Sequence, residues 1–402
     1  MLLCYEAPTN SGEIVELNGA EMRVLVAPQE LKGSLTAVEA AEAIAAGLLR
    51  GFPAVEVKMI PLADGGPGTL DTLVAARDGS TRTVTVSGPL GVPVRARFGI
   101  IDGSAVIETA EACGLVLLKQ EQLDPARATT FGVGELIRAA LDAGLRRFML
   151  GIGGSATNDG GAGLAQALGF RLLDAQGGEL DRGAAPLALL DRIDSLQADR
   201  RLSECTFQVA VDVQNLLCGP AGATAVYGTQ KGVRPEQASE FDAALRLLGE
   251  VIERDLGLGV LNLPGGGAAG GLGAGLAGFL HARLRPGFAI VAEATNVESE
   301  IAASQLVFTG EGRLDSQTPF GKTVAGVAGL AEKHGIPVVA LVGGIENDFE
   351  VNSVKGLTAA FAITPRPMTL DEAQQCAAVL LMRAAEQCAR LMRRLAGTTP
   401  DL

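Results

Sequence analysis

The chain has 402 residues, of which 48% are hydrophobic and 20% are charged, and its formal net charge at pH 7 is −13. This is a globular composition, and the length favours two domains over one. The acidic charge and the few aromatic residues (13 Phe, 2 Tyr, no Trp) exclude a nucleic-acid-binding protein, which needs a basic face and stacking platforms. No apolar run approaches the roughly 20 residues of a membrane span, so we expect no membrane partner either.

Residues 1–21 are polar and aperiodic, and a second methionine, Met22, directly precedes the first apolar run. We interpret this segment as a tail or a misassigned start, because it lacks the basic beginning and apolar core of a signal peptide. The six cysteines form no CxxC pair, and only two histidines are present to help them bind a metal. Buried, reduced thiols are therefore expected, and with them a cytoplasmic location.

The first folded unit has the pattern of strand, helix and strand. Residues 23–27 are a buried apolar run, and residues 55–61 form a second one. Between them the apolar positions of 35–48 recur with helical period behind Ser34, the expected N-cap. Such a βαβ unit favours parallel strands. A short helix is expected over 68–76.

The pattern changes after residue 80. Residues 81–86 and 94–98 flank a turn as in a hairpin, and residues 104–108 are suited to pair with them. Antiparallel pairing of this kind marks a different domain. The elements expected next are helix 132–143, a strand from 147, helix 162–168, strands 170–173 and 207–211, helix 235–255 and a glycine-rich loop over 264–278 that leads into a helix.

From residue 305 the alternation of strands and helices returns. The expected elements are strands 306–308, 337–342 and 357–363 and helices 321–334 and 370–394. We therefore predict an α/β protein in which a doubly wound parallel-sheet domain, residues 22–80 plus 286–402, is split by an inserted α/β domain, residues 81–285, with a mixed sheet. The cleft between the two domains is the default ligand site.

The most informative stretch is 147–163, an apolar run that ends abruptly in glycines, hydroxyls and one acid. Glycines let the backbone approach a ligand closely, and free N–H groups at a following helix start attract an anion. Ser155 and Thr157 add hydroxyl donors, while Asn158 and Asp159 add an amide and a carboxylate that suit a metal or a substrate hydroxyl. This set of groups favours a phosphate ligand.

Three distant segments repeat this chemistry, each joining glycine to charge at an expected strand end: 27–34, 62–69 and 309–318. In open α/β sheets ligands bind at the carboxyl ends of strands. Lys32, between a strand end and a helix start, is favoured as an anion ligand over an ordinary solvated lysine. Asp64 is equally suited to capping a helix and to binding a polyol or a metal.

Asp159 and Asp315 have the alternative role of turn-forming residues. A functional role is favoured for Asp159 by the neighbouring hydroxyls and glycines. It is favoured for Asp315 by its neighbours Glu311, Arg313 and Gln317.

Gly151, Gly153 and Ala156 also fit the loose dinucleotide fingerprint, with Asp174 as the ribose-binding acid about 20 residues on. Against this reading, residues 158–161 interrupt the helix that should follow directly. An NAD-dependent dehydrogenase is thus a weaker alternative.

Other motifs are weaker still. Gly321-Lys322-Thr323 is the end of a P-loop, but the required first glycine is Ser316. The triplet 230–232 (Gln-Lys-Gly) is interpreted as a turn. The isolated His281 and His334 have no matching acid and nucleophile, so no hydrolase triad is indicated.

The loop 151–163, together with 310–318 and Gly321-Lys322, closely resembles the bacterial glycerate kinase family, of the glycerate 2-kinase type. Supporting matches lie at 32–35, 63–66, 132–137, 230–232 and 270–275. The likeness runs from about residue 22 to 345. It implies ATP-dependent phosphorylation of D-glycerate to 2-phosphoglycerate with Mg²⁺, in a flavodoxin-like domain plus a second α/β domain. Glycerate is then the small-molecule partner, and a homodimer is left open.

This resemblance leads to a set of expected site residues. The ATP phosphates are assigned to the loops 151–163 and 265–276, through Gly153, Gly154, Ser155, Thr157, Asn158, Gly160, Gly161, Gly270 and Gly271. The acceptor is assigned to Lys32, Ser34, Asp64, Gly65, Gly66 and Arg313. The expected catalytic residues are Asp159, Asp315 and Lys322, and the expected metal ligands are Asp159, Asp212 and Glu311.

The chain departs from the family pattern at a few positions. Gln29, Pro67 and Gln214 stand where relatives usually carry an acid, and Cys113 stands where serine is common. Loss of carboxylates at ligand loops alters the handling of Mg²⁺ or the shape of the acceptor pocket. A kinase of a related hydroxy acid and a catalytically silent ligand-binding homologue are therefore kept as alternatives.

Overall fold

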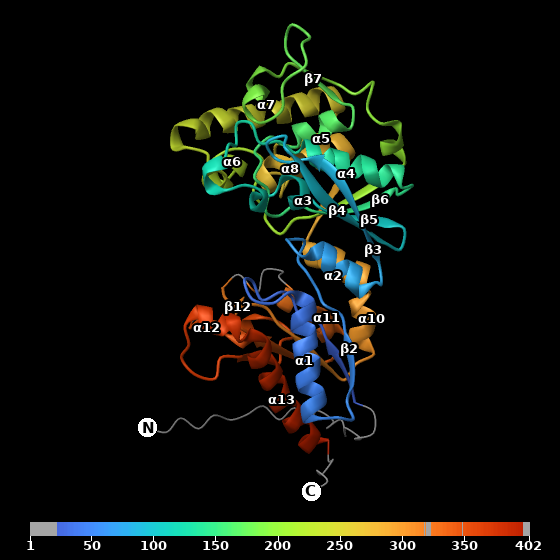
Figure 1. Cartoon of the computed structure of the whole chain (residues 1–402), viewed down its shortest axis with the longest axis vertical. Coiled ribbons are helices and arrows are strands. Elements are labelled where there is room, and N and C mark those ends of the chain that lie inside the picture. Colours follow the sequence, from blue (N-terminus) through green and yellow to red (C-terminus); the bar gives the residue numbers. More distant parts are fainter. Residues whose placement is uncertain (1–21, 317, 319–322, 348, 397–402) are drawn as a thin grey trace.

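The computed structural model of the chain describes residues 22–316, 318, 323–347 and 349–396. Two lobes follow one another along the long axis (Figure 1), and each is built on its own sheet. The five-stranded sheet takes its strands from residues 23–59 and 306–362, and the six-stranded sheet from residues 80–285. The exact domain boundaries stay a prediction.

The five-stranded sheet is parallel throughout, in the order β15-β13-β11-β1-β2. Its strands are β1 (Arg23–Val26), β2 (Glu56–Met59), β11 (Leu306–Thr309), β13 (Val338–Val342) and β15 (Ala359–Ala362). Counted within this lobe the order is 2-1-3-4-5, which is that of flavodoxin-like folds. The prediction of a doubly wound parallel sheet that is split in sequence is confirmed.

Side chains of β1, an interior strand of this sheet, alternate between two cores. Val24 and Val26 pack in the core beneath α1 (Ala37–Gly51) and α13 (Ala377–Leu395), whereas Leu25 packs with α11 (Thr323–Lys333) on the other face. Because successive strand residues point to opposite faces, a strand covered on both sides is a continuous apolar run. The remaining elements of this lobe are α9 (Gly287–Thr295), α10 (Val297–Ala302), α12 (Leu370–Gln375), β12 (Arg313–Leu314) and β14 (Gly344–Ile345).

Two helix limits differ from the sequence-based expectation. The N-cap of α1 is Thr36, not Ser34, because a bridge between Leu31 and Leu35 holds the intervening residues in a turn. Thr36 and Glu39 form a capping box, with Glu39 N donating to Thr36 Oγ1 at 3.2 Å. The helix expected over 370–394 is broken at Cys376 into α12 and α13.

The six-stranded sheet has the order β10-β9-β6-β5-β4-β3. The pairs β3–β4 and β4–β5 are antiparallel and the others are parallel, so the predicted mixed sheet is confirmed. Its strands are β3 (Ser80–Ser87), β4 (Pro93–Ile101), β5 (Ser104–Glu108), β6 (Arg147–Gly151), β9 (Thr206–Ala210) and β10 (Arg283–Arg285). The strand expected at 170–173 lies outside this sheet, because β7 (Arg171–Leu173) pairs with β8 (Arg192–Asp194).

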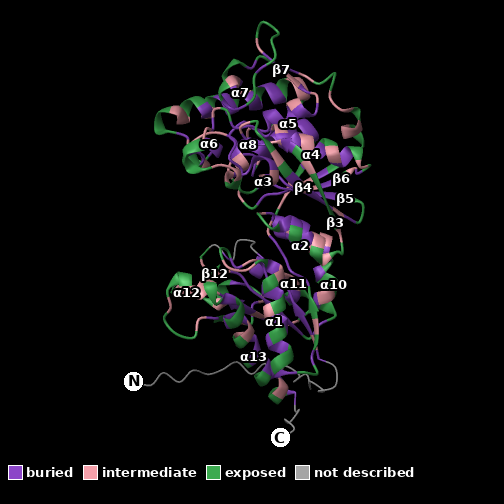
Figure 2. Ribbon diagram, in the orientation of Figure 1, coloured by how far each residue is buried: buried purple, intermediate pink, exposed green. Residues whose placement is uncertain are grey.

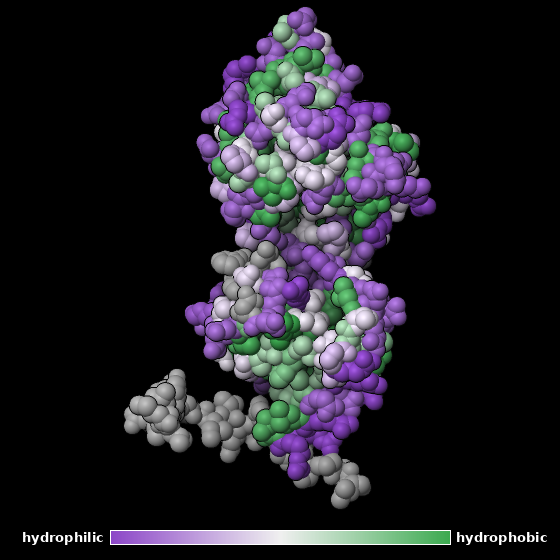
Figure 3. Space-filling model, turned by 90° about the vertical axis from the view of Figure 1, so that its left-hand side faces the viewer, coloured by the Kyte–Doolittle hydropathy of each residue, from purple (hydrophilic) through white to green (hydrophobic). Residues whose placement is uncertain are grey.

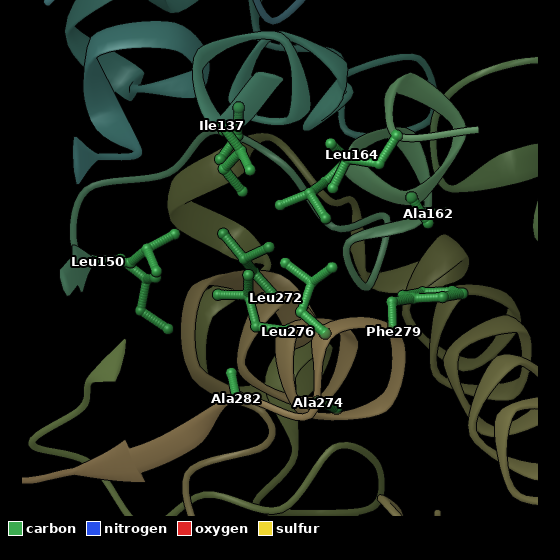
Figure 4. Close-up of a cluster of buried hydrophobic side chains, with 14 of the residues drawn as sticks. Ile137, Leu150, Ala162, Leu164, Leu272, Ala274, Leu276, Phe279 and Ala282 are labelled. Atoms are coloured by element: carbon green, nitrogen blue, oxygen red, sulfur yellow. The ribbon is translucent and has the colours of Figure 1, made fainter. Parts of the chain in front are cut away.

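The glycine-rich segment 264–278 is a loop that leads into a buried helix, as expected: within α8 (Ala268–Leu280) the residues Ala269, Gly270 and Gly271 have positive φ, so the regular helix begins at Leu272. Leu272, Leu276 and Phe279 pack inside the lobe against other helices and β6 (Figure 4). A Cβ at Gly275 would lie 2.1 Å from the Gly160 carbonyl oxygen, so glycine is what allows this close approach. The other helices of the lobe are α3 (Ala110–Cys113), α4 (Phe131–Asp142), α5 (Ala162–Ala167), α6 (Ala223–Tyr227) and α7 (Ala238–Leu256).

The lobes share an apolar core at their junction. Helix α2 (Thr69–Ala76) contributes Leu70 and Leu73, which belong to the same buried cluster as Val106 of β5 and Phe288 of α9. Figure 2 shows the buried face of α2 between the two lobes. No helix in the described part of the chain is long and apolar enough to cross a membrane.

Candidate functional site

Two adjoining cavities lie at strand ends, the first within the five-stranded lobe and the second where the two lobes meet. The first, here called the α12 cavity, has a volume of about 460 Å³ and lies between the segments after β1 and β11 and the helices α12 and α13. The second, the glycine-loop cavity, has a volume of about 320 Å³ and lies between the segments after β2, β6 and β9. Lys32 and Asp64 line both cavities. Figure 3 shows hydrophilic residues at the narrow waist between the lobes.

The glycines at this junction are needed because main chain meets main chain. A Cβ at Gly151 would lie 2.5 Å from the Gly65 carbonyl oxygen, and one at Gly287 would lie 1.6 Å from that of Asp64. The end of β6, in one lobe, is thereby in direct contact with the segment after β2, in the other.

Asp64 is held in a fixed orientation at the boundary of the two cavities. Its Oδ2 accepts a hydrogen bond from Gln29 Nε2 at 2.8 Å, and its Oδ1 accepts one from Gly66 N at 3.1 Å. Each carboxylate oxygen has a further lone pair for a ligand. Beside it, burial raises the pKa of Glu30, and the nearby Lys32 partly offsets this shift.

Asp212 follows β9 and lines the glycine-loop cavity. Its Oδ1 accepts a hydrogen bond from Gly287 N at 2.8 Å. The packed protein around the carboxyl raises its pKa to about 6, and the negative charge of Asp64 adds to this shift, although the side chain stays accessible from the cavity. A cation bound here would relieve the unfavourable interaction between the two carboxylates.

Lys231 is the site residue that sequence reasoning missed. Its side chain is only 2% exposed at the wall of the glycine-loop cavity, and Nζ donates to the Thr157 carbonyl oxygen at 2.7 Å and to Ser155 Oγ at 3.2 Å. Burial lowers its pKa to about 8. In the sequence the triplet 230–232 is only a supporting match to the family and a turn, its lysine has no assigned role, and nothing local shows that this lysine points inward.

The exposed part of the glycine loop borders the same cavity. Gly153 and Gly154 line it, and Ser155 Oγ, which donates to the Ala269 carbonyl oxygen at 3.1 Å, lies beside Lys231. In the described part of the chain neither the Gly153 amide nor the Gly154 amide donates to a protein acceptor. Two amides and an ammonium group make this wall suited to an anion.

Comparison with known proteins identifies the family to which this site belongs. The family model described as "Glycerate kinase family" matches residues 24–393. The chain belongs to the glycerate kinase family. The prediction of the family, and of a phosphotransferase as the class of enzyme, is confirmed.

Named relatives agree along nearly the whole chain. A glycerate kinase of Halalkalibacterium halodurans is 45% identical over 368 residues, 91% of this chain and 97% of that protein. A glycerate 2-kinase of Escherichia coli K12 is 44% identical over 370 residues, 92% of this chain and 97% of that protein. A crystal structure of a protein from Salmonella typhimurium LT2, assigned to glycerate kinase 2, has a TM-score of 0.85 and 44% identity and covers 93% of this chain and 99% of that one.

In this member of the family, Asp159 lies away from both cavities and is fully buried. Its Oδ2 accepts hydrogen bonds from Thr130 N (2.8 Å), Thr130 Oγ1 (2.9 Å) and Gly163 N (3.2 Å), and its Oδ1 accepts one from Gly161 N (3.2 Å). Burial raises its pKa, and these bonds offset the shift in part. The carboxylate joins the glycine loop to the start of α4, and the expected role of Asp159 as catalytic residue or metal ligand stays a prediction.

Several other expected phosphate ligands point inward as well. Thr157, Asn158, Gly160, Gly161, Gly270 and Gly271 are buried and line neither cavity. A Cβ at Gly270 would lie 2.0 Å from the Thr157 carbonyl oxygen, so this glycine serves close packing between the loop and α8. Of the residues assigned to ATP, only Gly153, Gly154 and Ser155 reach a cavity.

The residues expected to bind the acceptor do gather at the cavities, but not all at one. Gly65 and Gly66 line the glycine-loop cavity, whereas Ser34 and Arg313 line only the α12 cavity. Arg313 also pairs with Glu346, so it is not a free partner for a carboxylate ligand.

The remaining expected residues are placed as follows. Glu311 and Asp315 line the α12 cavity, and Glu311 Oε1 accepts a hydrogen bond from Thr318 Oγ1 at 3.2 Å. Lys322 lies outside the described residues. Asp174, the ribose-binding acid of the dehydrogenase alternative, closes its own turn by accepting from Gln176 N at 2.9 Å and Gly178 N at 2.8 Å.

The donor groups fit Mg²⁺ only in company with a phosphate ligand. Among the described residues no group of three or more His, Cys, Asp or Glu side chains could hold a metal ion. Mg²⁺, however, is usually bound by one or two carboxylates together with substrate phosphates and water. Asp212, whose carboxylate is accessible from the glycine-loop cavity, meets this requirement.

Proposed function

We propose that the chain transfers the γ-phosphoryl group of ATP to the 2-hydroxyl of D-glycerate, giving 2-phosphoglycerate and ADP. Membership of the family and the relative named glycerate 2-kinase support this reaction. The observation that carries it is the shared boundary of the two cavities, where a lysine, Lys32, and an oriented carboxylate, Asp64, face both spaces. Two ligands that meet at this boundary can exchange a group between them.

Phosphoryl transfer depends mainly on positioning the ligands and neutralising charge. Lys32 and Lys231 supply positive charge, and the amides of Gly153 and Gly154 supply hydrogen bonds to phosphate or carboxylate oxygens. Asp64, held by Gln29 and Gly66, accepts the proton of the attacking hydroxyl as the new P–O bond forms. The bond to the leaving phosphate breaks, and its electron pair stays with ADP.

Mg²⁺ would be held by Asp212 together with the phosphates. When bound, it supplies positive charge that stabilises the transferring phosphoryl group. The hydrogen bond from Gly287 N holds Oδ1 of Asp212, and the other oxygen of the carboxylate, Oδ2, would then bind the ion.

Release of ADP in a coupled assay, with glycerate and related hydroxy acids as acceptors, tests the proposal. We expect release that depends on D-glycerate, and phosphorus NMR of the product should show a 2-phosphate monoester. A preference for another hydroxy acid would show that this acid, and not glycerate, is the acceptor. Thermal stabilisation by ATP and glycerate without any ADP would instead indicate a catalytically silent homologue, as the neutral Gln29, Pro67 and Gln214 suggested.

A further inference from the structure

The two cavities differ in the charge of their walls. The α12 cavity brings together four carboxylates, those of Glu30, Asp64, Glu311 and Asp315, and two cationic residues, Lys32 and Arg313. One of these cations, Arg313, is already paired with Glu346. The glycine-loop cavity has two lysines, Lys32 and Lys231, against Asp64 and Asp212, and adds the amides of the glycine loop. Anions are therefore favoured in the glycine-loop cavity and disfavoured in the α12 cavity.

The cavities also differ in polarity. Apolar side chains from three segments line the α12 cavity: Leu31, Ile363, Leu370, Ala373, Ala377 and Leu380. Leu370 is 72% exposed, so a large apolar side chain stands at this cavity with nothing in the described chain covering it. Such exposed apolar surface beside polar groups is typical of ligand-binding grooves.

These properties separate the parts of the two substrates. Glycerate is a small anion with almost no apolar surface, and the triphosphate of ATP is a polyanion. Adenosine, by contrast, is uncharged, has two flat apolar faces and carries hydroxyl groups that carboxylates can accept from. Only adenosine matches a wall that is both apolar and acidic.

The position in the sheet agrees with this division. Residues 29–32 follow β1 and residues 311–315 follow β11, and these two strands flank the point where the strand order reverses. Nucleotides in open α/β sheets bind at that point, outside the carboxyl ends of the strands.

We propose that the α12 cavity is the nucleoside site. Adenosine lies against Leu370 and Ala373 of α12, the triphosphate crosses the boundary at Lys32, and the acceptor occupies the glycine-loop cavity beside Lys231. This assignment rests on the proposed function. In this assignment the glycine loop binds the reacting phosphate and the acceptor, and the nucleoside binds elsewhere.

Two changes in the wall of the α12 cavity test the assignment. Leu370→Ser removes an exposed apolar contact, and Ala373→Phe fills the space. We expect each to raise the dissociation constant of ADP, measured by isothermal titration calorimetry, by about 5-fold or more, because Leu370→Ser removes apolar contact with the base and Ala373→Phe blocks the space that the base needs. Pyrophosphate, which lacks the nucleoside, should bind to both variants as it does to the unchanged protein.

Two further variants serve as controls. Leu391→Ser alters a 63%-exposed leucine of α13 that lines neither cavity and should change neither ligand's binding. Lys231→Met should raise the dissociation constants of glycerate and pyrophosphate more than that of ADP, because the adenosine part of ADP lies in the other cavity. Circular dichroism checks that Ala373→Phe folds. If this variant does not fold, Leu370→Ser still tests the assignment, because Leu370 is exposed and its replacement should not disturb folding.

The outcomes separate this assignment from the proposed reaction. If the unchanged protein releases no ADP with glycerate but Leu370→Ser still weakens ADP, the reaction is wrong and the nucleoside site stands. If turnover is normal and both α12 variants raise the KM for glycerate while ADP binding is unchanged, the assignment is overturned and the reaction stands.

Discussion

Replacing Asp159 by asparagine should damage the stability of the protein and not its chemistry. The carboxylate is fully buried and accepts four hydrogen bonds, three at Oδ2 and one at Oδ1. An asparagine has only one acceptor oxygen. If that oxygen replaces Oδ2, the amide nitrogen faces the Gly161 N–H, and two donors oppose each other.

The magnitude follows from these contacts. A buried donor left without an acceptor costs roughly 1–3 kcal/mol. The three retained bonds lose the negative charge that makes such bonds about twice as strong as neutral ones. The smaller cost of burying a neutral amide offsets part of this loss. We therefore expect Asp159→Asn to lower the free energy of unfolding by about 3 kcal/mol.

Urea unfolding followed by far-ultraviolet circular dichroism measures this change, with Asp174→Asn as the matched control. Asp174 accepts both of its hydrogen bonds at Oδ1, which asparagine can reproduce, so its loss should stay below about 1 kcal/mol. Per folded molecule, kcat of Asp159→Asn should fall by less than about 10-fold. A kcat lowered by roughly 10² or more with an unchanged free energy of unfolding would show that Asp159 is a catalytic residue after all.

Three further predictions concern the cavities. Because the pKa of Lys231 is lowered to about 8 and its charge is needed, kcat/KM should fall as pH rises through about 8, and this limb should be absent from the pH profile of Lys231→Met. For stability the sign is opposite. Between about pH 8 and pH 10.5 the unfolded chain binds more protons at this lysine than the folded chain does, so the free energy of unfolding should rise with pH. Lys231→Met should lack this rise, and the same rise in the variant would assign it to other groups. Gly151→Ala would place a Cβ 2.5 Å from the Gly65 carbonyl oxygen, so the contact between the lobes must shift and kcat should drop by about 10-fold or more. The control is Gly91→Ala, at a turn where a Cβ would meet open space, and it should alter only stability. Chelation of Mg²⁺ should abolish turnover, and Asp212→Asn should raise the Mg²⁺ concentration for half-maximal rate by about 10-fold; an unchanged requirement would remove Asp212 as a ligand.

Local patterns in the sequence predicted the elements and the glycine loop, because periodicity and turn residues act over short distances. They could not predict which loop residues face a ligand. Thr157 is buried where α8, more than a hundred residues later, packs against the loop through Gly270, and Asp159 points inward to Thr130 at the start of α4.

Lys231 shows the same limit from the other side. A Gln-Lys-Gly triplet has the composition of an exposed turn, and the left-handed Gly232 (φ 93°) does end a short turn. Only the contacts with Ser155 and Thr157, from a distant part of the chain, bury its amine. Sequence reasoning also placed the N-cap of α1 at Ser34, because it could not foresee the bridge that delays the helix to Thr36.

The main-chain contact between Gly151 and Gly65 fixes the separation of the two lobes at the glycine-loop cavity by peptide geometry and not by side-chain length. Substitutions in either lobe can therefore reshape one pocket, and so the choice of acceptor or nucleotide, without altering the distance across which the phosphoryl group travels. New specificities on this scaffold should arise from wall residues, while these glycines stay in place.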